Sequence, residues 1–321
     1  MTKNKTCKLL LMLFTLAPLG VEAQGNAKKE PSAEARSEAA LQVDGFFWDV
    51  FHNGKYELIP DVINALTGIH LQYPNDSVTT AHVGFMKVWH LTERWRQEQF
   101  PPTIIEDAVV AQSYFQQAVR LNPDDKRYLG FLGGMTLAEG DIHRDEKLVH
   151  KGYVTLRKSI AAFPEFNLVT AGLVESVLPA NSDRFKRALE WQWKTLDVCV
   201  GEKFDRKNPD MTPYMNLETT VGDKRVCWNG DIAPHNFEGF FFNMGDMLAK
   251  AGDWHTAQKI YANARLSKTY DSWLYKDELE QRIVDAEANV ALFNEAPGPS
   301  GRPSHPVMFQ TEYACMSCHH N

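Results

Sequence analysis

The apolar residues between positions 41 and 293 follow the spacing of helices rather than that of strands. No segment keeps the period-two alternation of apolar and polar residues that a half-buried strand requires. Two Asn-Gly pairs, at positions 53 and 229, are turn signals, but neither joins two alternating apolar runs, so neither predicts a β-hairpin. The pattern therefore predicts an all-α protein.

A short pattern recurs within the predicted helices. A small residue, a large apolar residue, a second small residue and a helix-ending proline follow one another at fixed offsets. The two copies are Ala111, Phe115, Ala118 and Pro123, and then Gly152, Leu156, Ser159 and Pro164. Pro74 ends an earlier helix in the same way. Ten residues after Pro74 and after Pro123 stands a glycine, Gly84 and Gly133, where a neighbouring helix can approach closely.

A further copy near residue 250 is the most complete. Its residues are Met244, Gly245, Leu248, Gly252, Asp253, Trp254, Ala257, Tyr261 and Ala264. Together these copies resemble tetratricopeptide repeats, which are antiparallel helical hairpins stacked into a solenoid. The resemblance covers residues 41–294 but is degenerate, because the three prolines are 49 and 41 residues apart instead of about 34. It implies a concave surface for a protein partner and a capping helix over residues 272–293.

One long segment interrupts the repeats between residues 199 and 237. It holds charged and proline-containing stretches that predict a loop. It begins with one cysteine, Cys199, and contains a second, Cys227. Cys199 and Cys227 pair economically in a disulfide if the other two cysteines of the mature chain have another role, and the alternative is a free buried thiol. Such a disulfide closes a loop of 28 residues and would stabilise the fold by about 3 kcal/mol.

A strongly apolar run follows this insertion loop. It contains Phe237, Phe240, Phe241, Phe242, Met244 and Met247. One interpretation places these side chains in the core of the repeats. The other makes them a flat apolar wall for a flat apolar cofactor, roofed by the insertion loop.

The N-terminus has the pattern of a secretory signal peptide. Three lysines precede an apolar stretch at residues 9–19, and small residues at Val21 and Ala23 mark a cleavage site before Gln24. The apolar stretch is too short for a permanent membrane anchor. We therefore expect an exported, periplasmic or extracellular protein, with a signal peptide at 1–23, a flexible leader at 24–40 and the helical domain at 41–294.

Charge narrows the range of partners. The formal charge is −7, and cleavage of the signal, with three lysines and one glutamate, would leave about −9. An acidic chain is a poor ligand for nucleic acid or for an anionic membrane, so we expect neither as a partner. The sequence also lacks the motifs of serine hydrolases, phosphate-binding loops and zinc proteases.

The C-terminal motif Cys315-Met316-Ser317-Cys318-His319 carries the most specific chemical signal. This Cys-x-x-Cys-His spacing resembles the haem-attachment motif of c-type cytochromes. The resemblance implies one covalent haem c, with Cys315 and Cys318 as thioether anchors and His319 as the proximal axial ligand. Two alternatives stay open: a redox-active or oxidised cysteine pair, and a zinc or copper site completed by His320.

A tether precedes this motif. Together, tether and motif form the segment 295–321. Residues 296–306 within it are rich in proline and glycine and predict an extended, helix-free segment. We expect it to carry the haem to a pocket on the body, since haem is apolar. The candidates for the second axial ligand are His305, Met308, His235, Met244 and Met247.

These patterns suggest three functions. The first is an exported c-type haem protein whose helical repeats dock a partner, such as a redox protein, for electron transfer or within a redox complex. The second is a non-redox scaffold whose terminal motif binds a metal or forms a disulfide. The third is a haem enzyme resembling a peroxidase, which would need an open iron position. A carrier or binding subunit is favoured over a catalyst.

Overall fold

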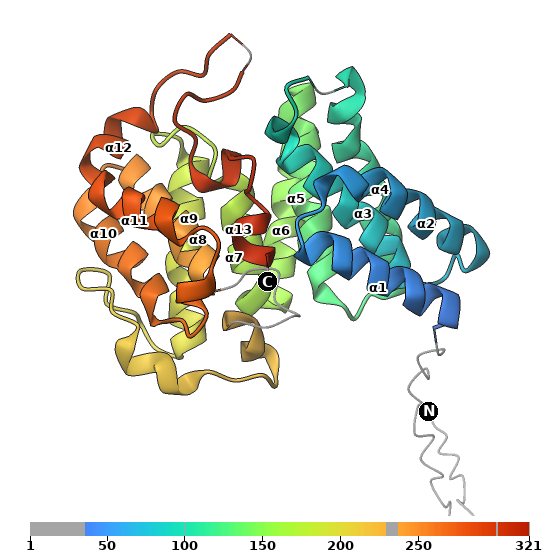
Figure 1. Cartoon of the computed structure of the whole chain (residues 1–321), viewed down its shortest axis with the longest axis horizontal. Coiled ribbons are helices and arrows are strands. Elements are labelled where there is room, and N and C mark those ends of the chain that lie inside the picture. Colours follow the sequence, from blue (N-terminus) through green and yellow to red (C-terminus); the bar gives the residue numbers. More distant parts are fainter. Residues whose placement is uncertain (1–35, 100, 229–236, 300, 321) are drawn as a thin grey trace, which may run out of the picture. The chain divides into compact units, whose positions relative to one another are not determined.

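A computed structural model describes residues 36–99, 101–228, 237–299 and 301–320, and these residues contain helices and no strand. The all-α prediction is therefore confirmed for this part of the chain (Figure 1). The α-helices are α1 (Glu38–His52), α2 (Ile59–Gln72), α3 (Ser77–Thr92), α4 (Glu106–Leu121), α5 (Lys126–His143), α6 (Glu146–Ala162), α7 (Pro164–Glu175), α8 (Asp183–Val200), α9 (Phe237–Lys250), α10 (Trp254–Ala262), α11 (Lys276–Val284), α12 (Ala286–Leu292) and α13 (Met316–His319). The connections contain 3₁₀ helices: η1 (Tyr56–Leu58), η2 (Arg94–Arg96), η3 (Pro102–Ile105), η4 (Thr212–Leu217), η5 (Asp223–Cys227), η6 (Asn263–Leu266), η7 (Tyr270–Ser272) and η8 (Met308–Gln310).

Local chemistry sets many of the helix boundaries. Pro74, Pro123 and Pro164 follow the ends of α2, α4 and α6, as predicted from the recurring pattern. At the other end, acidic or hydroxyl side chains accept hydrogen bonds from the first-turn amides. The capping residues are Ser37, Asp76, Asp125, Asp145, Ser182 and Asp253. These caps satisfy amides that have no partner within the helix, which fixes where each helix begins.

The first helix begins earlier than we expected. Because Ser37 caps it, α1 starts at Glu38, and Ala40 is buried. Arg36 also forms ion pairs with Asp44 and Asp76. The expected flexible leader therefore does not extend to residue 40, while residues 24–35 and the expected signal peptide lie outside the described residues.

Neighbouring helices approach closely at the glycines of the recurring pattern. A Cβ atom at Gly84 of α3 would lie 3.0 Å from the ring of Phe115 in α4. A Cβ atom at Gly133 of α5 would lie 2.8 Å from the backbone nitrogen of Leu156 in α6. Gly245 of α9 likewise leaves room for the ring of Tyr261 in α10. Consecutive helices thus form packed pairs, as the small residues predicted.

The prediction of a single capping helix over residues 272–293 is wrong. The structure has η7, α11 and α12 in this region, and α11 ends at Val284, before Asp285, whose backbone has φ −90° and ψ 9°. The helix starts only at Lys276 because Trp273 turns inward, where its Nε1 donates to the Ser317 carbonyl over 3.0 Å. A contact 44 residues away therefore overrides the local helical pattern.

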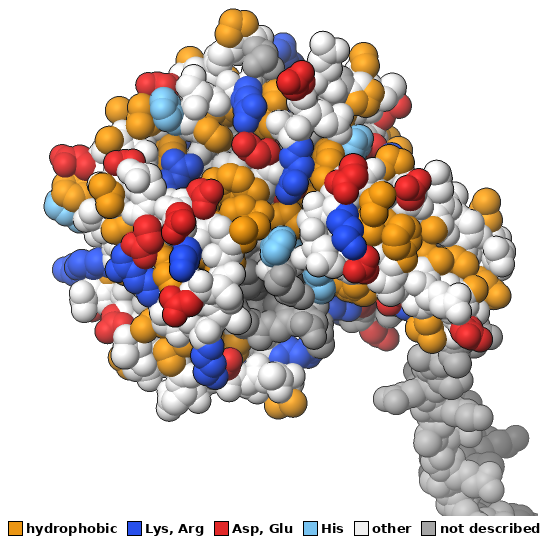
Figure 2. All heavy atoms as spheres, viewed as in Figure 1, with side chains coloured by type: hydrophobic (Ala, Val, Ile, Leu, Met, Phe, Trp, Pro, Cys, Tyr) orange, Lys and Arg blue, Asp and Glu red, His pale blue; other side chains and the backbone are white. Residues whose placement is uncertain are grey.

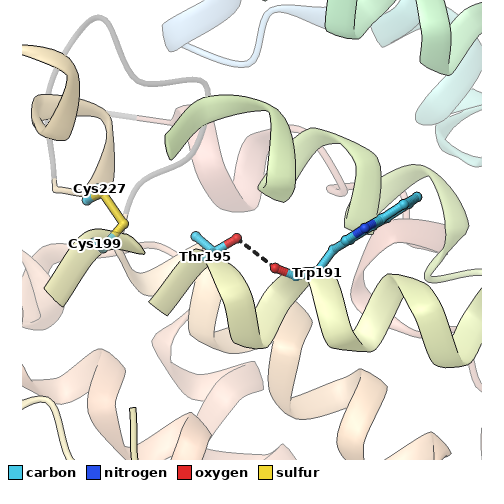
Figure 3. Close-up of a disulfide and its surroundings, with 4 residues drawn as sticks. All are labelled: Trp191, Thr195, Cys199 and Cys227. Atoms are coloured by element: carbon cyan, nitrogen blue, oxygen red, sulfur yellow. Dashed lines mark hydrogen bonds between the residues drawn. A yellow bond between two sulfur atoms is a disulfide. The ribbon is translucent and has the colours of Figure 1, made fainter. Parts of the chain in front are cut away.

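The disulfide between Cys199 and Cys227 is confirmed. Cys199 lies in the last turn of α8, one turn beyond Thr195, and its sulfur is 2.03 Å from that of Cys227 at the end of η5 (Figure 3). The described part of the insertion loop packs onto the body, because Phe204, Met211 and Trp228 are all buried. Residues 229–236, including the ligand candidate His235, lie outside the described residues.

The apolar run after the loop is core. The side chains of Phe241, Phe242, Met244 and Met247 in α9 are at most 1% exposed, and only Phe240 is half-buried. This burial agrees with the first interpretation of the run. It leaves no open wall at these residues on which a cofactor could lie.

The surface shown in Figure 2 mixes charges of both signs. Lysine and arginine side chains alternate with acidic ones across this face, so it presents no broad area of one sign. In the part of the chain with described coordinates, no helix is long and apolar enough to span a bilayer.

We predict that Gly152→Ala lowers the free energy of unfolding by about 1–3 kcal/mol, because overpacking shifts a close helix contact. The added Cβ would lie 2.6 Å from the backbone nitrogen of Leu137. Urea unfolding followed by circular dichroism measures the change. Gly68→Ala is the matched control: its Cβ meets no atom within 4 Å, so the better helix former should stabilise α2 by about 0.5–1 kcal/mol. Equal effects at both sites would contradict the close packing.

Replacing Cys199 and Cys227 together by alanine should destabilise the protein by about 3 kcal/mol, because the unfolded chain regains the freedom of the loop. Urea unfolding with and without a reductant provides the test. Reduction should lower the stability of the parent chain by a similar amount and leave the double variant unchanged. A parent chain that is insensitive to reduction would count against this stabilising role.

Candidate functional site

The C-terminal segment is part of the hydrophobic core. Its last helix, α13, packs against α9 and α1, and Figure 1 shows it in red between them. Met308 and Met316 are fully buried and belong to the same apolar cluster as Phe51 and Trp89. The predicted tether is free of α-helix, as expected, but the segment after it is docked on the body.

A buried carboxylate holds the start of α13. Glu93, directly after α3, is completely buried. Its Oε1 accepts hydrogen bonds from the backbone amides of Cys315 and Met316, at 2.7 and 2.9 Å. Its Oε2 accepts from Trp89 Nε1 at 2.8 Å and from Arg96 Nε at 2.7 Å. Burial raises the pKa of Glu93, although the charge of Arg96 and the hydrogen bonds from Met316, Trp89 and Arg96 act against this change.

A second buried carboxylate holds the chain upstream. Asp246 of α9 is fully buried, and its Oδ2 accepts from the Met308 amide at 2.6 Å. Its Oδ1 accepts from the Tyr261 hydroxyl and lies 3.6 Å from Arg282 Nε. Burial also raises the pKa of this carboxyl. Glu93, Asp246 and Trp273, which donates to the Ser317 carbonyl, thus hold the backbone of the segment at three places.

The two motif cysteines lie on one turn of helix and are not joined in a disulfide. The amides of Cys318 and His319 both donate to the Cys315 carbonyl, at 3.0 Å. Cys318 is 6% exposed and Cys315 is half-buried. Desolvation raises the pKa of Cys318 to about 12 and that of Cys315 well above its ordinary value, where the nearby Glu93 adds to the effect.

The surroundings of the motif are aromatic. The imidazole of His319 lies 4.6 Å, between ring centroids, from Phe51 of α1. Phe51 in turn meets Trp89 edge to face at 5.1 Å. Two thiols and an imidazole on one turn in apolar surroundings suit covalent haem attachment, because a thioether is uncharged. The residues that would hold the haem are therefore Cys315, Cys318 and His319.

The same surroundings weaken the two alternatives. A redox-active cysteine pair needs an accessible thiolate, which burial disfavours here. Within the described ranges, no group of three or more histidine, cysteine, aspartate or glutamate side chains is arranged to hold a metal ion. Cys315, Cys318, His319 and His320 thus do not converge as the ligand set of a zinc or copper site.

The structure separates the five candidates for the second axial ligand. Met308 lies at the motif, where its Sδ accepts from Ser317 Oγ at 2.9 Å. Met244 belongs to the same apolar cluster as the motif, whereas Met247 belongs to a different cluster. His305 lies on the tether, 3.3 Å from Glu295. His235 is outside the described residues.

Sequence reasoning missed the residues that hold the motif. Glu93, Phe51 and Trp273 contact it from three separate regions of the chain. Glu93 directly follows α3 and lies between Trp89 and Trp95 in the sequence, a position that does not by itself indicate a contact with the C-terminal motif. A cavity of about 620 Å³ also lies in this region. It is lined by Tyr56, Glu57, Pro60, His90, Trp95, Arg96, Gln97, Arg302 and Glu312.

Comparison with protein-family models, with curated proteins and with solved structures found no match to this chain.

The raised pKa of Glu93 predicts a pH-dependent contribution to stability. Its ordinary value is 4.5. Between that pH and the raised pKa of the folded state, the folded state holds a proton that the unfolded state releases, so this contribution is present at low pH and falls as pH rises through this range. Relative to Glu93→Gln, the parent chain should lose stability with rising pH above about 4.5, by up to about 1.4 kcal/mol per pH unit.

Urea unfolding at several pH values measures this difference. Glu57→Gln is the control, since Glu57 is exposed and should leave the pH dependence of the parent chain unchanged. A constant difference between Glu93→Gln and the parent chain would contradict the prediction.

Proposed function

We propose that this chain is an exported c-type haem protein that uses a helical-repeat body to dock a protein partner. Cys315 and Cys318 would each hold the haem through a thioether, and His319 would be the proximal axial ligand. The haem would supply one-electron chemistry at its iron. The role that fits this arrangement best is electron transfer or service as a subunit of a redox complex.

The observation that carries this proposal is that the Cys-x-x-Cys-His residues form one helical turn with both cysteines free of a disulfide, in aromatic surroundings. A buried thiolate is costly, so the site suits neither thiol redox chemistry nor metal thiolate binding. A thioether has no charge and tolerates the same environment. His319 stands next in the chain, and Phe51 packs beside its ring.

The body would contribute positioning rather than chemistry. Glu93 accepts from the two amides that open α13 and so fixes the orientation of the attachment turn. Trp273 fixes the next carbonyl, that of Ser317. Aromatic side chains around the turn exclude water. The reduction potential of a haem depends on such surroundings as well as on its axial ligands.

The packed helix pairs support a docking role. The close approaches at Gly84, Gly133 and Gly245 match the small-residue positions of tetratricopeptide-like hairpins. A solenoid of such hairpins would present a concave surface to a protein partner, such as a redox protein. The disulfide is compatible with the oxidising compartment to which the predicted signal peptide would direct the chain.

Expression with a cytochrome c maturation system tests the proposal directly. We expect a haem-stained band after denaturing electrophoresis and an intact mass increased by one haem. Replacing Cys315 and Cys318 by serine should abolish both signals while most of the helical circular dichroism persists, because the remaining helices pack with one another. An unstained parent chain of apo mass would refute the proposed function.

Spectra of the loaded protein then separate a carrier from an enzyme. We expect the sharp visible bands of low-spin, six-coordinate haem in the reduced protein, as suits electron transfer. A high-spin spectrum that changes on addition of peroxide would instead indicate the peroxidase-like alternative. Met308→Leu, compared with Met247→Leu in the separate cluster, would show whether Met308 supplies the second ligand.

A further inference from the structure

The docked turn is incompatible with the chemistry that would load it. Attachment requires each thiol to add across a vinyl group, so that a carbon–sulfur bond forms and the thiol hydrogen passes to the neighbouring vinyl carbon. Cys318 is 6% exposed and belongs to the main apolar cluster. A macrocycle cannot approach this sulfur while α13 stays in place.

Besides the packing of Met308, Met316 and Cys318 in the apolar cluster, polar contacts hold the segment at a few discrete points. Glu93 holds the amides of Cys315 and Met316, Trp273 holds the Ser317 carbonyl, and Asp246 holds the Met308 amide. All four backbone groups belong to the C-terminal segment, and all three partners belong to the body. These polar contacts act together with the burial of Met308 and Met316 to hold the segment in place.

The chain before the segment is suited to act as its hinge. None of the described residues between the end of α12 and the start of α13 lies in an α-helix. Gly301 has φ 78°, a conformation that favours glycine, and it closes a turn by donating to the Gly298 carbonyl at 2.8 Å. The side-chain pairs here, Arg302 with Glu312 and His305 with Glu295, are exposed and therefore weak.

We infer that the C-terminal segment is a latch: closed, it withholds both motif thiols from reagents, and it must open before a haem can be attached to them. Glu93 and Trp273 act as positioning residues that favour the closed state. The haem part of this inference rests on the proposed function. The latch itself concerns only the apo-protein, so it can be tested without haem.

The test is the rate at which the apo-protein, made without a haem-attachment system, reacts with iodoacetamide at one fixed pH. Intact mass first establishes that Cys315 and Cys318 are reduced, and peptide mapping then follows each of them. Cys199 and Cys227 do not react while they are joined. The rate in urea gives the reactivity of the open segment. We expect the folded chain to react at least tenfold more slowly.

Two variants weaken the latch at different points. Glu93→Gln removes one of the two acceptor oxygens, and Trp273→Phe removes the donor to Ser317 while keeping an aromatic ring. Each should raise the labelling rate of Cys318, roughly tenfold or more for Glu93→Gln. Glu57→Gln and Trp254→Phe are the matched controls and should leave the rate unchanged. Circular dichroism shows whether each variant keeps its helices. If Glu93→Gln is unfolded, the result for Trp273→Phe provides the test.

Each outcome is decisive for the latch. Slow labelling of the parent chain that speeds up in both folded latch variants, but not in the controls, supports it. Labelling of the folded parent chain at the urea rate, or rates unchanged in folded latch variants, would overturn it. Haem staining of the same variants separates the two proposals, because absence of haem in every chain would remove the proposed function and leave the latch intact.

Discussion

The carboxylate of Glu93 joins two parts of the chain that are 222 residues apart. It is buried, and each of its oxygens accepts two hydrogen bonds, one pair from the C-terminal backbone and the other from Trp89 and Arg96. A buried charge without such partners would be strongly unfavourable. The last turn of the chain and the end of α3 therefore depend on each other: each satisfies groups that the other would leave unpaired.

A second buried carboxylate, that of Asp246, links the C-terminal segment to α9 in the same way. One oxygen of Asp246 accepts a hydrogen bond from the Met308 amide and the other accepts one from the Tyr261 hydroxyl, with Arg282 nearby. Tyr261 occupies the space that Gly245 leaves in the pair α9–α10. The geometry of a helix pair and the path of the C-terminal segment are thus linked through a single carboxylate. Breaking a buried pair on one side only is costly, which favours a single position for the segment.

These contacts give the attachment turn an unusual environment for two thiols. Burial raises the pKa of both, whereas cysteines that act as nucleophiles have a lowered pKa and partial exposure. The site is better suited to sulfur that carries no charge and needs no further access. A covalently modified sulfur fulfils that condition, and a latch explains how the modification and the burial can belong to the same protein at different times.

Features that depend on residues close together in the chain could be predicted from the sequence. Helix ends at Pro74 and Pro123, the small residues at Gly84 and Gly133, and the pairing of Cys199 with Cys227 all followed from local spacing or from the number of cysteines. The Cys-x-x-Cys-His motif could also be recognised in the sequence, because it consists of five consecutive residues.

Only the tertiary structure decided where the C-terminal segment goes. Glu93 looks in the sequence like any charged residue at a helix end, and its role depends on backbone amides more than two hundred residues away. Trp273 likewise stops the helix expected from residue 272, because its indole bonds to Ser317. Backbone donors and acceptors are the same at every residue, so no side-chain pattern marks which of them a distant carboxylate will meet. Periodicity predicts which face of a helix is buried, and packing alone selects what covers it.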